Sequence, residues 1–453
     1  MTTAAATAAA TLPTPGIQPA PGWRNYRFEL VKLLAQWPVR VALLACWIVP
    51  GLLVAAISSQ NSLPTDAVFG RWMDQTGWAG PLVLLAFAAN WVLPLLAALL
   101  AGDAFASEDR LATWRHLLVA VRSPRRIFWA KVLASLTILL VIALGLTGSG
   151  IAGGIAVAGN RPLVGLDGQL LAPGHVAGVV LLAWISALAP TLAFAGAGLL
   201  GSVAFGRSPL GLVIPALLAL LMQIVLVLPL PVAVRVALPG YAYIAWRGLF
   251  TDPVQIAPLL ISVAVSLALA VACFALAYRL FMRRDFTDLA YDGVGRRVLI
   301  RGALPLTALF AVMVGVIALV AAPSSTGITR GKLDRSLDTA FTNLYRIQTT
   351  ELHRPAVTAA HLRASAACDK GGPLVPDSGP GGDWRCVIKW RLPGVTAVGQ
   401  VIYQLDVDAN GRYEADGDGP QEVNGYFSVR TATGTVPNPL WQFDGSIDLL
   451  TAT

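Results

Sequence analysis

Seven apolar stretches constrain the fold of this chain more than any other feature of its sequence. They lie at about residues 40–58, 78–101, 132–158, 176–203, 209–229, 256–281 and 302–322. A helix needs about 20 apolar residues to cross roughly 30 Å of hydrocarbon. Because lipid offers no partners to backbone polar groups, stretches of this kind must be helical. The sequence therefore predicts a multi-span α-helical membrane protein with about seven transmembrane helices.

Composition supports the same fold class. Hydrophobic residues make up 56% of the 453 residues and charged residues only 13%, whereas about a quarter of an average soluble chain is charged. So little charge excludes a disordered chain, a coiled coil and an ordinary soluble protein.

The distribution of basic residues predicts the orientation. The formal net charge is +8, yet residues 1–302 hold 21 Lys and Arg against 11 Asp and Glu, and the remainder holds 12 against 14. Seventeen of those 21 basic residues flank one set of connections, and the other set holds four, namely Arg71, Arg161, Arg235 and Arg247. Since cytoplasmic loops are enriched in Lys and Arg, the N-terminus is predicted to be cytoplasmic and the chain after residue 322 extracytoplasmic. The basic excess sets orientation here, and a nucleic-acid partner is not expected.

The first segments of the chain precede the membrane. Residues 1–22 are rich in Ala, Thr and Pro and carry no charged side chain, so they lack the basic region of a secretory signal and are interpreted as a disordered cytoplasmic lead. Residues 25–37 place apolar side chains at helical spacing among Arg27 and Lys32, which is typical of a helix at the membrane interface. The alternative, an early extension of the first span, is disfavoured by Pro38.

A different composition begins after the last apolar stretch. Residues 324–453 predict an extracytoplasmic α+β domain with a helix over 333–347 and strands at about 384–392, 399–407, 425–429 and 440–449. The predicted organisation is thus a lead at 1–22, a six-span region at 23–300, a seventh span at 301–323 and this domain.

The four cysteines divide along the same boundary. Cys46 and Cys273 lie in apolar stretches and are interpreted as packing residues. Cys368 and Cys386 both fall in the outer domain, where oxidation is permitted, and are predicted to form a disulfide; two free thiols are the alternative. The ligand spacing of a zinc site is absent.

The connection at 101–135 carries the most informative pattern. Acidic residues (Asp103, Glu108 and Asp109) open it, with Ser107 as a candidate N-cap. An amphipathic helix follows, and its apolar residues recur at helical spacing, namely Leu111, Trp114, Leu117 and Leu118. Ser123-Pro124 then predicts a break. A short helix held beneath the membrane suits the docking of a cytoplasmic partner; the alternative is a linker lying on lipid headgroups.

This connection resembles the segment between the second and third spans of type-2 ABC exporter permeases. The matching residues are Glu108, Arg110, Ala112-Thr113, Leu117-Leu118, Pro124, Arg125-Arg126 and Lys131. An interfacial helix, a six-span core and a Pro-rich outer stretch at 229–250, similar to the family's short re-entrant helices, extend the resemblance over about 23–290. Ala112 stands where the family has Gly, and the seventh span and outer domain are additions to the family's core.

The resemblance implies a permease subunit in a bacterial plasma membrane, surrounded by lipid and paired with an identical or related permease. It implies that a cytoplasmic ABC ATPase contacts Glu108, Arg110, Thr113, Trp114, Arg115, Leu117 and Leu118. The sequence has no G-x-x-x-x-G-K-[ST] phosphate loop, so ATP and Mg²⁺ are expected on the partner. No residue of this chain is predicted to be catalytic or to hold a metal or cofactor.

The apolar stretches contain almost no ionisable residue, which argues against a proton- or sodium-driven carrier. Asn90 and Gln223 are the polar exceptions. Each is a candidate for lining a substrate pathway, and hydrogen bonding between helices is the alternative.

Two patterns in the outer domain have ordinary structural interpretations. Residues 406–411 match the start of a calcium loop, but Gly417 stands where a bidentate Glu is needed, so a hairpin turning at 409–411 is preferred. His353 and His361, eight residues apart on a predicted helix, are interpreted as surface histidines.

The alternative function for the whole chain is a non-transporting membrane scaffold or sensor whose outer domain binds a ligand or an envelope partner.

Overall fold

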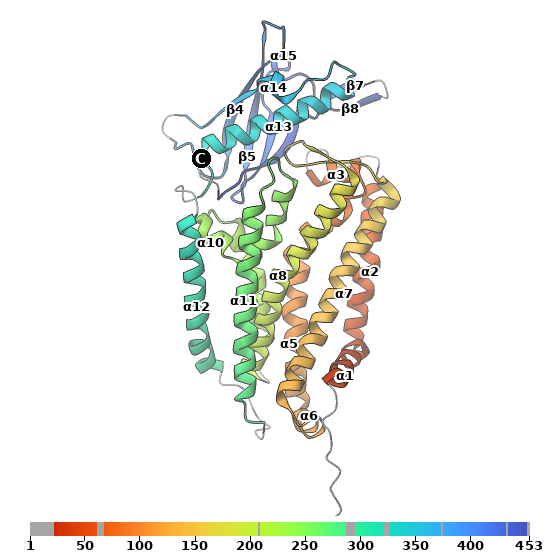
Figure 1. The fold of residues 1–453 in the computed structure, drawn as a ribbon, viewed down its shortest axis with the longest axis vertical. Coiled ribbons are helices and arrows are strands. Elements are labelled where there is room, and N and C mark those ends of the chain that lie inside the picture. The colour runs from red at the N-terminus through yellow and green to blue at the C-terminus, as the bar shows by residue number, and fades with distance from the viewer. Residues whose placement is uncertain are drawn as a thin grey trace, which may run out of the picture.

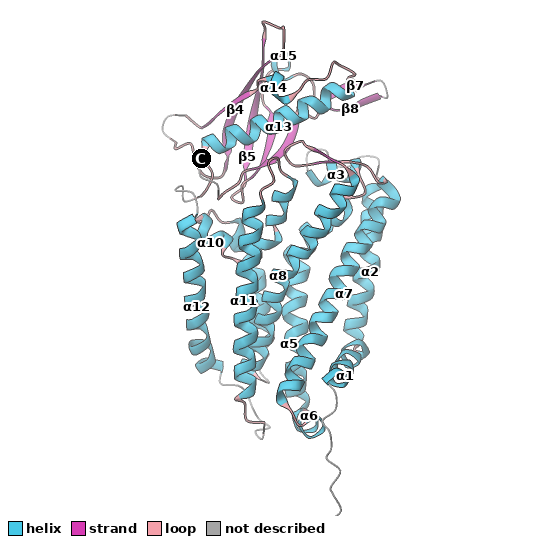
Figure 2. Ribbon diagram, in the orientation of Figure 1, coloured by secondary structure: helices cyan, strands magenta, loops and turns pink. Residues whose placement is uncertain are grey.

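The computed structural model describes residues 22–60, 68–206, 209–286, 295–320, 326–372, 375–431 and 434–450. A helical bundle carries an α+β domain at one end (Figures 1 and 2). Among these residues, five helices are long and apolar enough to cross a membrane: α2 (Trp37–Ser58), α7 (Pro124–Ala158), α8 (Pro173–Phe205), α9 (Leu210–Val227) and α11 (Ile256–Met282). The protein is therefore a multi-pass membrane protein.

The other two predicted spans also fall on helices. The second is divided into α4 (Ala79–Phe87), the π-helical η1 (Ala88–Val92) and α5 (Leu93–Leu111). Pro94 lacks the N–H that would bond one turn back, which accounts for the wider turn before it. The seventh falls on α12 (Gly295–Val320), whose apolar described part is Leu306–Leu319.

Small residues set the close spacing of the bundle. A Cβ on Gly198 of α8 would overlap the backbone of Ala98 in α5, and a Cβ on Gly153 of α7 would overlap Gly51 in α2. Helices can approach this closely only where side chains are absent, so these glycines explain the packing of the Gly-rich third and fourth spans.

Short elements close both ends of the bundle. At one end, α1 (Gly22–Ala35) packs on α7 and is separated from α2 at Gln36, where the backbone becomes extended before Pro38. The predicted separate helix before the first span is thus confirmed, whereas the predicted lead, apart from Gly22, lies outside the described residues. The opposite end holds α3 (Val68–Gln75), the hairpin β1–β2 (Leu163–Val164, Leu170–Leu171), α10 (Val232–Val236), η2 (Pro239–Tyr243) and η3 (Ala245–Phe250).

The C-terminal domain confirms the predicted α+β class. A five-stranded antiparallel sheet has the order β3-β4-β5-β6-β9 (Ser365–Lys370, Gly381–Arg391, Val398–Val407, Arg412–Gly417, Gln442–Ser446). Alternate residues of β4 are buried, including Trp384 and Ile388, and α13 (Arg330–Glu351) packs on the sheet with Phe341 5.0 Å from the Trp390 ring. Two short helices, α14 (Ala359–Leu362) and α15 (Gln421–Asn424), and the hairpin β7–β8 (Ser428–Thr431, Gly434–Pro437) complete it.

Most predicted elements of this domain are found. The hairpin at 409–411 joins β5 to β6, and Gly411 has a φ of 86°. The strand expected at 440–449 is only β9. The strands β3, β6 and β8 lie outside the predicted ranges, and the sequence of β3, SAACDK, lacks apolar alternation. The prediction that one helix carries both histidines is wrong. The helix α13 ends at Glu351, His353 follows it with a φ of 52°, and His361 lies in the separate helix α14.

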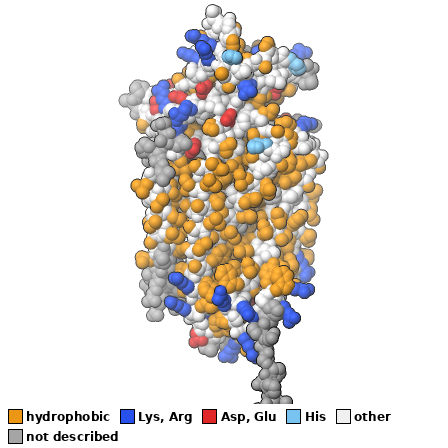
Figure 3. All heavy atoms as spheres, viewed as in Figure 1, with side chains coloured by type: hydrophobic (Ala, Val, Ile, Leu, Met, Phe, Trp, Pro, Cys, Tyr) orange, Lys and Arg blue, Asp and Glu red, His pale blue; other side chains and the backbone are white. Residues whose placement is uncertain are grey.

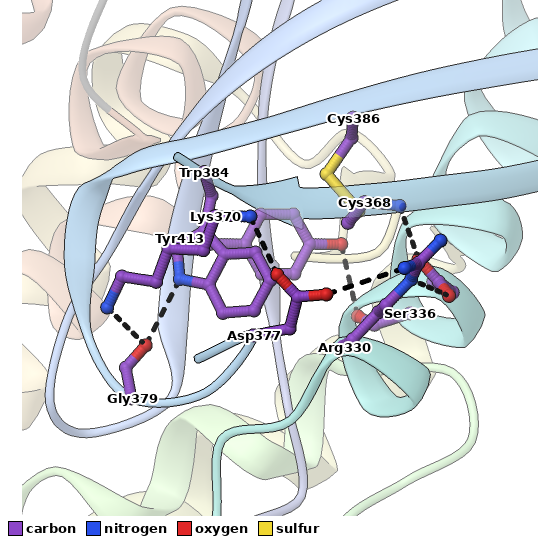
Figure 4. Close-up of a disulfide and its surroundings, with 10 residues drawn as sticks. Arg330, Ser336, Cys368, Lys370, Asp377, Gly379, Trp384, Cys386 and Tyr413 are labelled. Carbon is purple, nitrogen blue, oxygen red and sulfur yellow. Dashed lines mark hydrogen bonds and ion pairs between the residues drawn. A yellow bond between two sulfur atoms is a disulfide. The ribbon is translucent and has the colours of Figure 1, made fainter. Parts of the chain in front are cut away.

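The predicted disulfide is confirmed. Cys368 and Cys386 are bonded and lie directly opposite each other on β3 and β4. Figure 4 shows the bond beside α13, where the Cys368 amide donates to Asp334 Oδ1 at 2.8 Å. Cys46 and Cys273 are buried free thiols, as predicted. A disulfide in this domain is consistent with an extracytoplasmic location.

The C-terminal domain is joined to the bundle by hydrogen bonds and by an ion pair between Arg71 and Asp444. Asp167, in the β1–β2 hairpin, accepts from the backbone amides of Ser446 at 3.2 Å and Asp252 at 3.1 Å. Gln255 Nε2 donates to the Ser446 carbonyl at 2.8 Å, and Arg71 pairs with Asp444. We call this contact region the outer joint.

Candidate functional site

The connection singled out in the sequence lies at the end of the bundle opposite the C-terminal domain (Figure 1). It comprises the end of α5, the helix α6 (Trp114–Val121) and the start of α7. The prediction that Ser107 begins a helix is wrong, because α5 continues to Leu111 and ends at Ala112, whose φ is 54°. The predicted break after α6 is confirmed: Arg122 has a φ of 54°, and Pro124 begins α7.

Glu108 is the centre of a buried ionic cluster at this end. Its side chain is fully buried and accepts from Lys131 Nζ at 2.7 Å, and it also contacts Lys32 and Thr113. Lys131 Nζ donates in addition to Glu29 Oε2 at 2.9 Å. Burial alone would raise the pKa of Glu108, but Lys131, Lys32 and Thr113 lower it to about 2. The carboxylate therefore stays ionised and ties α5 to α1 and α7.

Asp109 makes the second set of buried contacts. It accepts from Trp114 Nε1 at 2.8 Å and from two guanidinium nitrogens of Arg284, one of them Nη1 at 3.0 Å. The Trp114 ring lies 5.2 Å from Phe281 and 5.7 Å from Phe286. These contacts fasten the first residue of α6 to α5 and to the end of α11.

The predicted partner-contact residues thus fall into two groups. Glu108 and Trp114 are buried, Thr113 bonds to Glu108, and Leu117 and Leu118 are half-buried against the core. Arg110 is exposed and pairs with Asp103 at 2.6 Å, and Arg115 is exposed. Val119 is exposed over 75% of its surface and lies four residues after Arg115, on the same side of α6, and exposed Arg122 directly follows the last residue of the helix. We call Arg115, Val119 and Arg122 the α6 face.

Sequence reasoning did not connect three members of the cluster to this site. Glu29 and Lys32 belong to α1, more than 70 positions from Glu108, and Arg284 follows α11. The available signal was an isolated acidic residue in an otherwise basic and apolar helix, Glu29, which requires a cationic partner if it is buried.

The structure describes the side chain of only one of the two candidate pathway residues. Asn90 lies in η1, and its side chain is outside the described residues. Gln223 is buried in α9, and its Nε2 has no partner in the described part of the chain. An apolar groove of about 340 Å³ lies between α8, α9, α11 and α12, lined by Phe194, Met222 and Phe310 among others, but Gln223 does not line it.

Figure 3 shows the surroundings of the site on one face of the molecule. Hydrophobic side chains cover the bundle, and Lys and Arg gather at the end that holds α6. Among the described residues, no group of three His, Cys, Asp or Glu side chains could hold a metal ion. Neither a family model nor a curated protein sequence matches this chain.

Proposed function

We propose that this protein is the membrane-spanning permease subunit of an ABC exporter, moved by ATP that a separate cytoplasmic ATPase hydrolyses. The observation that carries the proposal is the buried ionic cluster around Glu108 and Asp109, which fastens α6 to α1, α5, α7 and the end of α11. ATP and Mg²⁺ belong to the partner, and a second permease chain and membrane lipid complete the assembly.

A buried ion pair fixes the relative positions of its helices more reliably than it stabilises the fold. Removing charges from water costs several kcal/mol for each ion, and their mutual attraction returns this only when the contacts are well aligned. Such a cluster makes sense where a fixed arrangement is required. Force applied to α6 would pass through Trp114 and Asp109 into several helices at once, which is the requirement for a rigid-body transition driven from outside the membrane.

The α6 face supplies the surface for that force. Val119 is a large apolar side chain exposed beyond the apolar belt, flanked by the cations Arg115 and Arg122. Leu111, the last residue of α5, is 68% exposed. Exposed apolar residues surrounded by charge are typical of protein contacts. The partner surface is therefore expected to be apolar with an acidic rim.

The experiment compares variants of the α6 face in the full chain, purified from its own host membranes. Wild-type protein is expected to co-purify with Mg²⁺-dependent ATP hydrolysis, and Arg115→Glu and Val119→Glu to reduce that activity at least tenfold while thermal unfolding is unchanged. Arg430→Glu, a matched reversal on the exposed C-terminal domain, is the control. Glu108 is unsuitable for this test because its side chain is buried. Full ATPase activity with both variants would contradict the proposal.

The second candidate function is a sensor or scaffold that acts through the C-terminal domain. A cavity of about 680 Å³ at the outer joint favours it, since its lining includes both the bundle and the domain. If ligand binding persisted while no ATPase activity accompanied even the wild-type protein, the sensor would replace the exporter.

A further inference from the structure

The cavity at the outer joint has the size of a small-molecule site. Its volume of about 680 Å³ lies within the range of ligand pockets, roughly 300–1,000 Å³. Residues of α3 and the β1–β2 hairpin form the bundle side, and residues of α13, β8 and β9 form the domain side. Two separately folded parts of the molecule thus line one space.

Glu351 brings a carboxylate into this space. Leu344, Ile347 and Glu351 line the cavity and are three and seven residues apart, so they share one side of α13. Leu344 and Ile347 are apolar, and Glu351 occupies the next position on this side of the helix, where a third apolar residue would continue the pattern. Its Oε2 is buried and has no hydrogen-bond partner in the described part of the chain. A buried acceptor without a donor is destabilising, and more so when it is charged.

Gln75 is a second lining residue with an unmatched acceptor. Its Oε1 is buried and also lacks a partner among the described residues. Gln75 is the last residue of α3, on the bundle side, whereas Glu351 is the last residue of α13, on the domain side. Each side of the cavity is therefore lined by a residue that carries a buried oxygen without a partner among the described residues.

The charges around the cavity favour a cation. Arg71 pairs with Asp444, which also accepts from Arg412 at 2.5 Å, so the lining carboxylates Asp74, Glu351 and Asp444 outnumber these two guanidinium groups. Asp74 adds another carboxylate to the lining. Together with Glu351, it gives the space a negative balance at neutral pH.

Aromatic side chains provide the remaining walls. Trp441 and Phe427 line the cavity, and Phe427 is 69% exposed although it is a large apolar residue. Aromatic faces attract cations and cover apolar groups. A ligand that satisfied all these features would carry a cationic N–H donor on an apolar body.

We propose that this cavity binds an organic amine whose ammonium donates to Glu351 and whose apolar body packs against Trp441 and Phe427. Gln75 Oε1 accepts a further hydrogen bond from the ligand or from a bound water. The amine is either a free molecule or the ammonium of an aminophospholipid headgroup, since both present the same chemistry. The site is independent of the proposed coupling at α6.

Calorimetry with the full-length protein in detergent tests the site. The probes are 4-phenylbutylamine and 4-phenylbutan-1-ol, which differ only in the ammonium and hydroxyl groups. The amine is expected to bind at least tenfold more tightly than the alcohol. Glu351→Gln should remove that preference, because it replaces the carboxylate with a neutral amide of the same shape. Glu422→Gln, on exposed α15, is the matched control and should keep it.

Two further variants separate binding from folding. Trp441→Ala should weaken both probes, and Gln75→Met should weaken the amine about threefold or more while thermal unfolding is unchanged. Equal affinity for the two probes, or an undiminished preference for the amine in Glu351→Gln, would overturn the proposal. Competition in phosphatidylethanolamine nanodiscs but not in phosphatidylcholine nanodiscs would assign the site to a lipid-borne amine, and no competition in either would assign it to a free amine.

Discussion

The two ends of the bundle bury carboxylates in opposite ways. At the α6 end, Glu108 lies against Lys131 and Lys32, and Asp109 lies against Arg284. At the outer joint, the buried carboxyl group of Asp167 accepts from the backbone amides of Asp252 and Ser446 and has no ion pair in the described part of the chain. Burial raises the pKa of Asp167 to about 8, an effect that the backbone hydrogen bonds oppose and Asp252 increases.

This difference makes the contact around Glu108 independent of pH and the contact around Asp167 dependent on it. Because its cationic partners lower the pKa of Glu108 to about 2, this carboxylate stays ionised over the physiological range and holds its contacts at the α6 end. A buried carboxyl without a cation gains or loses its proton near neutral pH, and stability changes with it. The bundle is thus joined rigidly to α6 at one end and conditionally to the C-terminal domain at the other.

The largest effect is expected from removing the central carboxylate of the α6 end. Glu108→Ala leaves Lys131 and Lys32 without their shared partner in a buried site, which typically costs 3–5 kcal/mol. Thermal unfolding in detergent measures it. Asp103→Ala, which breaks an exposed pair with Arg110, should cost less than about 1 kcal/mol. Equal effects of the two variants would show that the cluster does not stabilise this end.

Removal of the disulfide should affect the C-terminal domain alone. Replacing Cys368 and Cys386 with Ala frees a loop with a sequence separation of 18, and the chain-entropy model predicts a loss of about 3 kcal/mol. Hydrogen exchange is expected to increase in β3 and β4 and to stay unchanged in the bundle. Increased exchange throughout α5 and α7 would show instead that the domain stabilises the whole chain.

The outer joint should weaken as pH rises. A separated Asp167 releases its proton near 3.8, whereas the joined form holds it up to about 8. The raised pKa therefore favours the joined form at low pH, and this advantage is lost between about pH 4 and 8. We expect a loss of about 2 kcal/mol between pH 6 and 8, measured by exchange of the amides of Asp252 and Ser446. Asp167→Ala should remove the pH dependence, and an unchanged slope in that variant would assign the effect to another group.

The smallest effect concerns the turn between α5 and α6. Ala112 has a φ of 54°, which is unfavourable for a residue with a Cβ. Ala112→Gly is expected to stabilise the protein by about 1 kcal/mol, measured by thermal unfolding. Ala120→Gly, inside α6, should destabilise it by a similar amount. Destabilisation by both variants would mean that the turn does not strain Ala112. This position is the one where the sequence departs from the Gly of the exporter permeases it resembles.

Much of the site could not be predicted from sequence. The amphipathic pattern indicated a helix that includes α6 but placed its start at Ser107, inside α5, and it gave no distinction between Glu108, which is buried, and Arg115, which is exposed. Partners such as Glu29 and Lys131 are 102 positions apart, and no local pattern reports a contact over that separation. The strand β3 was not predicted for a related reason. Its own residues show no strand pattern, and its extended conformation depends on pairing with β4 and on the disulfide.

The sequence by itself determined the membrane class, the apolar helices, the α+β domain and the disulfide. Each of these depends on a local property: the length of an apolar run, the period of alternation, or the compartment in which two thiols lie. The tertiary structure decided which charges are buried and what faces them, and it alone created the cavity between α3 and α13. Burial and pairing depend on residues brought together from distant segments, so they exist only once the helices and the domain have packed.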